Sequence, residues 1–195
     1  MNCLRSLPVV FIVLVLASCS SAPPQDDGYF SGGELAPPSE STLLMTGRVL
    51  GSKGLTNQAE LVLGRLIKDH PEYLPGYTEL AELLLNEGRI KDASRILGAG
   101  LEKFPGNPIL LNDLGMCHLL EGDLDSADVS FNAAISASPR DSVYIGNYAL
   151  VLALQGNDSK AVELWSTILS RKDSLENLKQ AQDSVLYRGN RGSEK

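Results

Sequence analysis

Residues 111–127 read LNDLGMCHLLEGDLDSA, and residues 145–161, which begin 34 positions later, read IGNYALVLALQGNDSKA. In both stretches, apolar residues recur every three or four positions and the run ends at a glycine, Gly122 or Gly156. This pattern predicts an amphipathic helix that stops at the glycine and is followed by a second helix. A fixed period of this length is typical of stacked repeats.

The same period extends over most of the chain, in five columns of residues. Small residues should let helices approach closely, glycines should take a left-handed backbone where each first helix ends, and prolines should close each repeat. The columns are Gly54, Gly88, Gly122 and Gly156; Ala59, Ala93, Ala127 and Ala161; Pro71, Pro105 and Pro139, with Asp173 in fourth place; Gly47, Ala81, Gly115 and Ala149; and Leu63, Leu97, Phe131 and Trp165.

These columns resemble the tetratricopeptide repeat (TPR). The resemblance implies an all-α fold, a TPR solenoid of about four helix-turn-helix repeats with a C-terminal capping helix. Repeat one is the least regular, because Thr46 stands where a large apolar residue is usual. The solenoid is expected at residues 41–175, with repeats at about 40–73, 74–107, 108–141 and 142–175, a capping helix at 176–188 and a disordered tail at 189–195.

The N-terminus has the pattern of a signal peptide. Arg5 precedes an apolar run, Leu7–Ala17, that is about 11 residues long, whereas a membrane-spanning helix needs roughly 20. Leu16-Ala17-Ser18-Cys19 resembles the bacterial lipobox. The resemblance implies removal of residues 1–18 and acylation of Cys19, for example with palmitate. The alternative is an ordinary secretory signal with an incidental cysteine.

The segment after Cys19 predicts a tether. Residues 19–40 are rich in Pro, Ser, Gly and acids and show no apolar periodicity, so we expect disorder there. Ser20 follows the lipobox cysteine in place of the Asp that is linked to inner-membrane retention. By resemblance, this implies a lipid anchor in the outer membrane, with the chain facing the periplasm.

The charge balance excludes one class of partner. The chain has a formal net charge of -7; residues 1–18 contain one basic and no acidic residue, which leaves 16 basic and 24 acidic residues, or -8, in the remainder. Nucleic-acid binding needs a basic surface to replace phosphate counterions, so we expect no nucleic-acid partner.

No catalytic or metal-binding group emerges from the sequence. His118 occupies a column that holds leucine in other repeats, and Cys117 beside it points about 100° away on a helix, so the two are a poor nucleophile–base pair. The acidic stretch 121–128 lacks the order of a calcium loop and suits helix capping. We expect no enzymatic activity, no cofactor, no metal and no small-molecule substrate.

The remaining candidate site is the groove that first helices line in TPR stacks. It would be apolar with two Asn amides and would suit a helix or an extended segment of a partner protein. Each residue could instead simply pack against a neighbouring helix. A carboxylate clamp found in some family members is expected to be absent, because its positions hold Arg48, Glu82, Met116 and Leu150. The candidate groove residues are Asn112, Met116, Leu119, Leu120, Gly146, Asn147, Leu150, Ala153 and Leu154.

Within the TPR lipoproteins, Asn112–Met116 and Gly146–Gly156 resemble paired stretches of the TadD component of tight-adherence (Flp) pilus systems. That resemblance implies an accessory lipoprotein that helps a secretin or pilus-assembly component to assemble. The alternative is a periplasmic adaptor that scaffolds cell-wall hydrolases. An enzyme, the third class, would need a buried polar cluster in the groove.

Overall fold

The computed structural model describes residues 37–192, with side chains through Ser184. The expected signal peptide, the acylated Cys19 and most of the expected tether lie outside the described residues. The described helices belong to one compact unit that begins at Pro38. Its secondary structure is entirely helical over residues 37–192.

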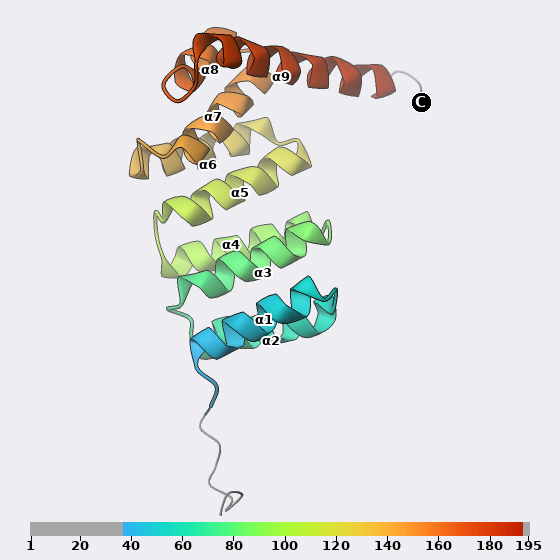
Figure 1. The fold of residues 1–195 in the computed structure, drawn as a ribbon, viewed down its shortest axis with the longest axis vertical. Coiled ribbons are helices and arrows are strands. Elements are labelled where there is room, and N and C mark those ends of the chain that lie inside the picture. The colour runs from blue at the N-terminus through green and yellow to red at the C-terminus, as the bar shows by residue number, and fades with distance from the viewer. Residues whose placement is uncertain (1–36, 193–195) are drawn as a thin grey trace, which may run out of the picture. The chain divides into compact units, whose positions relative to one another are not determined.

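The helices form consecutive antiparallel pairs, α1 with α2 through α7 with α8, as Figure 1 shows. This confirms the all-α solenoid expected from the 34-residue period. The helices are α1 (Glu40–Ser52), α2 (Thr56–Asp69), α3 (Leu74–Asn86), α4 (Ile90–Lys103), α5 (Pro108–Glu121), α6 (Leu124–Ala137), α7 (Ser142–Leu154), α8 (Asp158–Trp165) and α9 (Arg171–Gly192).

The turn inside each pair depends on a glycine. Gly54, Gly88, Gly122 and Gly156 have φ of 71°, 71°, 83° and 82°, so the left-handed backbone expected at the end of each first helix is confirmed. A residue with a Cβ would be strained in this conformation. Asp123, just after Gly122, accepts a hydrogen bond from the Ser126 backbone N–H at 3.1 Å and caps α6. This confirms the capping role expected of that acid.

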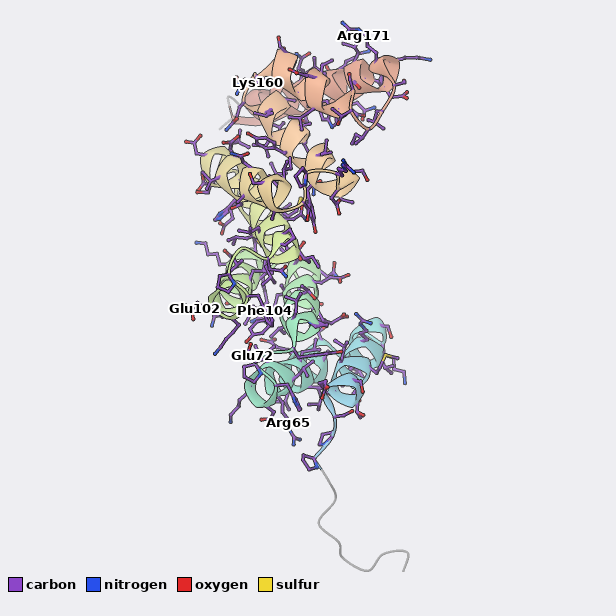
Figure 2. All side chains as sticks on the ribbon, turned by 90° about the vertical axis from the view of Figure 1, so that its left-hand side faces the viewer. Arg65, Glu72, Glu102, Phe104, Lys160 and Arg171 are labelled. Carbon is purple, nitrogen blue, oxygen red and sulfur yellow. The ribbon has the colours of Figure 1, made fainter. Side chains whose placement is uncertain are left out.

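The core is built where a large residue of each second helix meets a small residue of the first. Phe131 is fully buried, and a Cβ added to Gly115 would lie 2.9 Å from the Phe131 ring. Within repeat two, Tyr77 of α3 packs edge-to-face on Phe104 with 6.1 Å between ring centroids. Phe104 directly follows α4, two residues after Glu102, and both side chains are labelled in Figure 2. Successive repeats are joined by packing of α2 on α3, α4 on α5 and α6 on α7, so each repeat closes on itself and on the next one.

The fourth repeat differs from its expected bounds. α8 has 8 residues whereas α2, α4 and α6 have 14, and the chain turns at residues 166–170. Ser170 then starts α9: its hydroxyl accepts from the Asp173 backbone N–H at 3.2 Å and donates to the Asp173 carboxylate at 2.7 Å. This capping arrangement favours a new helix over continuation of α8.

The cap is consequently longer than the segment expected at 176–188. α9 begins at Arg171 and runs to Gly192, so residues 189–192, expected to be disordered, are helical. Between Arg171 and Gly192 there is no proline, and one interior glycine costs only about 1 kcal/mol in a helix. α9 packs on α7 and α8 and so covers the exposed end of the stack. Within residues 37–192, no helix has the length and apolarity needed to cross a membrane.

Gly115→Ala should destabilise the fold by about 1–3 kcal/mol, because the new methyl group would overlap the buried Phe131 ring. The matched control is Gly98→Ala in α4, where nothing lies within 4 Å of the added Cβ. That change should be neutral or stabilise by up to about 1 kcal/mol. Urea denaturation followed by circular dichroism measures both, and equal stability of the two variants would contradict this account of the core.

Candidate functional site

The first helices of the four repeats lie side by side. α1 contacts α3, α3 contacts α5 and α5 contacts α7, whereas the described second helices α2, α4 and α6 do not contact one another. On a helix, positions i, i+4, i+7 and i+11 share one side. We call the surface made by these positions of α1, α3, α5 and α7, counted from Ser41, Pro75, Ile109 and Val143, the inner face.

The half of the inner face on α5 and α7 is apolar. Its side chains at the helix ends stand out, with Ile109 43% exposed, Leu120 52% and Val143 58%. Between them, Met116, Leu150 and Leu154 are half-buried and pack on the buried cluster around Phe131. Several large apolar side chains exposed along one surface are characteristic of a binding site. We call these six residues the apolar half.

The half on α1 and α3 is mostly polar and charged, with Met45 of α1 as its exposed apolar side chain at 57%. The Arg48 Nε–H donates to the Glu79 carboxylate at 2.6 Å and joins α1 to α3. Glu82 and Asn86 are exposed on the same side of α3. A hollow of about 320 Å³ lies between these helices, lined in part by Arg48, Glu79, Glu82 and Asn86. We call this surface the polar half.

A short hydrogen-bonded chain crosses the middle of the inner face. The Asn147 side-chain amide in α7 donates to the Asn112 side-chain oxygen in α5 at 2.8 Å. The Asn112 amide in turn donates to the Asp113 carboxylate at 3.2 Å. Asn112 is 7% exposed, so its amide is committed to these neighbours and joins α5 to α7.

Asp113 lies where the two halves meet. Burial raises the pKa of its carboxyl group, the hydrogen bond from Asn112 opposes that rise, and the negative charge of Glu82 on α3 adds to it. The contribution of Glu82 means that the carboxylates of two neighbouring first helices lie within electrostatic reach of each other.

The structure distributes the residues expected in the groove over three environments. Leu120 is exposed on the inner face. Met116, Asn147, Leu150 and Leu154 are half-buried there, and Gly146 is half-buried on α7 beside the inner face. Asn112, Leu119 and Ala153 are buried between helices, at 7%, 8% and 3% exposure.

On α5 and α7, three inner-face residues were not in the expected set: Ile109, Asp113 and Val143. A helical projection of α5 would have found the first two, because Ile109, Asp113, Met116 and Leu120 have the spacing i, i+4, i+7 and i+11. Val143 takes the place of Ile109 one repeat later.

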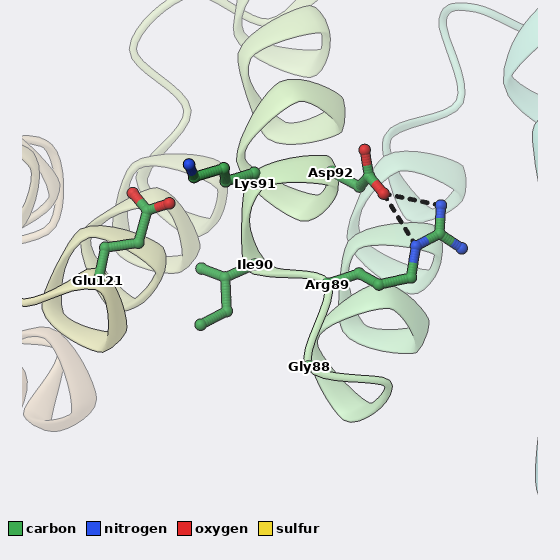
Figure 3. A pocket seen from close by; sticks show the side chains of 6 residues that line it. All are labelled: Gly88, Arg89, Ile90, Lys91, Asp92 and Glu121. Atoms are coloured by element: carbon green, nitrogen blue, oxygen red, sulfur yellow. Dashed lines mark hydrogen bonds and ion pairs between the residues drawn. The ribbon is translucent and has the colours of Figure 1, made fainter.

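Other candidate chemistry has structural explanations. Cys117 is fully buried in α5, and no hydrogen bond to His118 occurs in the described structure. Across the residues whose side chains are described, no three His, Cys, Asp or Glu come together in a way that could hold a metal ion. Another hollow, of about 410 Å³, lies at the start of α4, where Arg89 pairs with Asp92 (Figure 3). Arg89 also pairs with Glu60, so its charge is already compensated.

The comparisons with known proteins agree with the repeat pattern. Residues 52–114 match the family model described as tetratricopeptide repeat. Among curated proteins, the chain is similar to the protein CTR9 homolog of Arabidopsis thaliana, with 28% identity over 120 residues. That match covers 61% of this chain and 11% of the length of the relative.

Solved structures show the same fold at low identity. MamA from Desulfovibrio magneticus RS-1 superposes with a TM-score of 0.57 at 19% identity, over 74% of this chain and 78% of that one. YrrB, described as a TPR protein with an unusual peptide-binding site, gives 0.60 at 15%, over 78% and 79%. The Cut9–Hcn1 structure gives 0.63 at 16%, over 75% and 30%. The fold is that of a TPR solenoid.

Cys117 should resist thiol reagents in the native protein. Burial raises the pKa of this thiol to about 11, so near neutral pH its thiolate fraction is about a hundredfold smaller than that of an ordinary cysteine. Ellman's reagent should therefore react slowly with the Cys3→Ser/Cys19→Ser protein and rapidly after addition of urea. Fast labelling without urea would show that α5 opens or that Cys117 is accessible.

Proposed function

We propose that this TPR solenoid is a membrane-anchored scaffold that holds a segment of another protein on its inner face. The supporting observation is the apolar half, where Ile109, Leu120 and Val143 are exposed on helices fixed by a packed core. Side chains held in place this way lose little entropy when a partner covers them.

Most of the binding free energy would come from the few exposed apolar side chains of the apolar half. Covering an exposed apolar side chain yields roughly 25 cal/mol for each Å² removed from water. A groove of this kind suits an amphipathic helix or an extended segment with regularly spaced apolar residues. Among the neighbouring structures, YrrB is described as a TPR protein with an unusual peptide-binding site and Cut9–Hcn1 as a hetero-tetramer, so peptide binding and association with another chain are described for those proteins.

The membrane anchor is the second part of the proposal. Cleavage before Cys19 and acylation of its thiol would hold the chain at the outer membrane, facing the periplasm. The support is the Leu16–Cys19 pattern after a short apolar run. Two or three acyl chains bind membranes far more stably than one, at about 0.8 kcal/mol for each buried CH₂ group.

The cellular role is the third part. The resemblance of Asn112–Met116 and Gly146–Gly156 to a tight-adherence pilus lipoprotein favours a secretin or another pilus-assembly protein as the partner. In this role the protein performs no chemistry. The anchor provides location, and the inner face retains one segment of the channel or pilus machinery during assembly.

Leu120→Glu combined with Val143→Glu should abolish partner capture. Two charges would enter the apolar half, and affinity should fall by about a hundredfold or more. Leu154 is a worse choice for this test, because it packs on two buried clusters and its replacement would disturb the fold. The measurement is a cross-linked pull-down of the acylated protein from detergent-solubilised envelopes, read by mass spectrometry.

The matched control is Leu61→Glu combined with Val129→Glu. These leucine and valine side chains are 75% and 69% exposed on the second helices α2 and α6, away from the inner face. Recovery of a secretin or pilus-assembly protein that only the inner-face variant loses supports the proposal. Recovery of murein hydrolases favours the adaptor alternative, and equal loss or retention in both variants refutes inner-face binding.

Cys19→Ala should abolish acylation and release the protein from the membrane fraction. Metabolic labelling with an alkyne-bearing palmitate analogue, followed by fractionation of envelopes, measures both effects. Cys3→Ala is the matched control and should retain label and location. A protein that stays membrane-bound and labelled without Cys19 would contradict the anchor.

A further inference from the structure

The contacts across the inner face differ from one helix boundary to the next. An ion pair, Arg48 with Glu79, joins α1 and α3. An amide hydrogen bond, Asn147 to Asn112, joins α5 and α7. At the boundary of α3 and α5, the positions one repeat after Arg48 and Glu79 hold Glu82 and Asp113, so two carboxylates approach each other there instead. This central boundary therefore combines two like charges, which repel.

The described structure compensates this pair only in part: Arg48 acts electrostatically on Glu82, but its side chain is hydrogen-bonded to Glu79. None of the ion pairs among residues 37–184 includes Glu82 or Asp113. The sequences of α1, α3, α5 and α7 contain one arginine, no lysine and five acidic residues. The arginine is Arg48, so Glu79, Glu82 and Asp113 share a single positive charge on these helices.

The carboxylate pair adjoins the apolar half. Asp113 shares its side of α5 with Met116 and Leu120, which lie one and two turns further along the helix. Packed helices are about 8–10 Å apart, so the centre of the apolar half, between α5 and α7, is about 10 Å from the Glu82–Asp113 boundary. Three residues of an extended chain, or seven of a helix, span that distance.

We infer that the occupant of the inner face is a partner segment that places a lysine or arginine between Glu82 and Asp113 and its apolar side chains on Met116, Leu120 and Leu150. This inference rests on the proposed function and specifies the chemistry of its ligand. The cation would relieve the repulsion between the two carboxylates, and the apolar residues would supply most of the affinity.

Charge complementarity argues against one occupant from within the chain. Residues 20–36 contain Asp26, Asp27 and Glu34 but no basic residue, so they would add negative charge to an acidic boundary. Residues 188–195 contain three basic residues, Arg188, Arg191 and Lys195, against one acidic residue, Glu194, so the C-terminus of a second copy is the competing occupant. The experiment below separates it from a foreign segment.

The test is selection of random dodecapeptides on phage against the mature protein in detergent. Peptides enriched on the wild type should carry Lys or Arg about three or seven positions from a pair of large apolar residues. Glu82→Gln/Asp113→Asn should bind the selected synthetic peptides about tenfold or more weakly in fluorescence polarisation. It should also lose most of the salt dependence seen with the wild type.

The control variant is Glu72→Gln/Glu102→Gln. It removes two carboxylates that are not inner-face residues and that are labelled in Figure 2. It should bind the peptides like the wild type. A peptide whose basic residue is replaced by glutamine should lose its preference for the wild type and bind Glu82→Gln/Asp113→Asn at least as well, because the charge coupling has been removed. Thermal melting checks that each variant is folded.

The outcomes separate the two proposals. Enrichment of apolar peptides without a basic residue, or unchanged binding by Glu82→Gln/Asp113→Asn, overturns the cation inference and leaves inner-face binding intact. Binding that survives Leu120→Glu/Val143→Glu overturns the proposed function as well. Self-association in analytical ultracentrifugation that is lost both on deleting residues 188–195 and in Glu82→Gln/Asp113→Asn would identify a second copy as the occupant instead.

Discussion

The contact of a large side chain from each second helix with a small residue of its first helix determines the rest of the structure. Phe131 fills the space that a side chain on Gly115 would need, and Leu63 stands in the same relation to Gly47. Because each pair closes at a similar distance, the four first helices are brought side by side in register. The residues of the inner face align from repeat to repeat only because this packing sets the spacing behind them.

The repeat positions predicted most of the fold, and the departures from it have local causes. The columns predicted the helix pairs and the left-handed glycines, and the acidic stretch 121–128 predicted the cap of α6 at Asp123. The early end of α8 and the start of α9 at Arg171 were missed, although Ser170 and Asp173 have the spacing of a capping box. In that repeat a local capping signal outweighed the period.

The candidate site was harder to predict for a physical reason. Family positions do not say whether a groove residue faces solvent or a neighbouring helix, and Asn112 and Ala153 proved buried at 7% and 3% exposure. Helical projection could have added Ile109 and Asp113. The proximity of Glu82 to Asp113, in contrast, depends on how α3 packs on α5 and required the structure.

The fold tolerates the repulsion between Glu82 and Asp113 because these residues lie on the inner face and not in the apolar core. The columns behind the inner face are buried and apolar, and the described structure leaves no buried side-chain polar atom without a hydrogen bond. Repulsion between Glu82, which is exposed, and Asp113, which is partly buried, is weakened by water on one side. A partner that covers both carboxylates would remove this screening, so an uncharged segment would make the repulsion worse. The same surface would therefore favour a cationic segment and disfavour neutral or acidic ones.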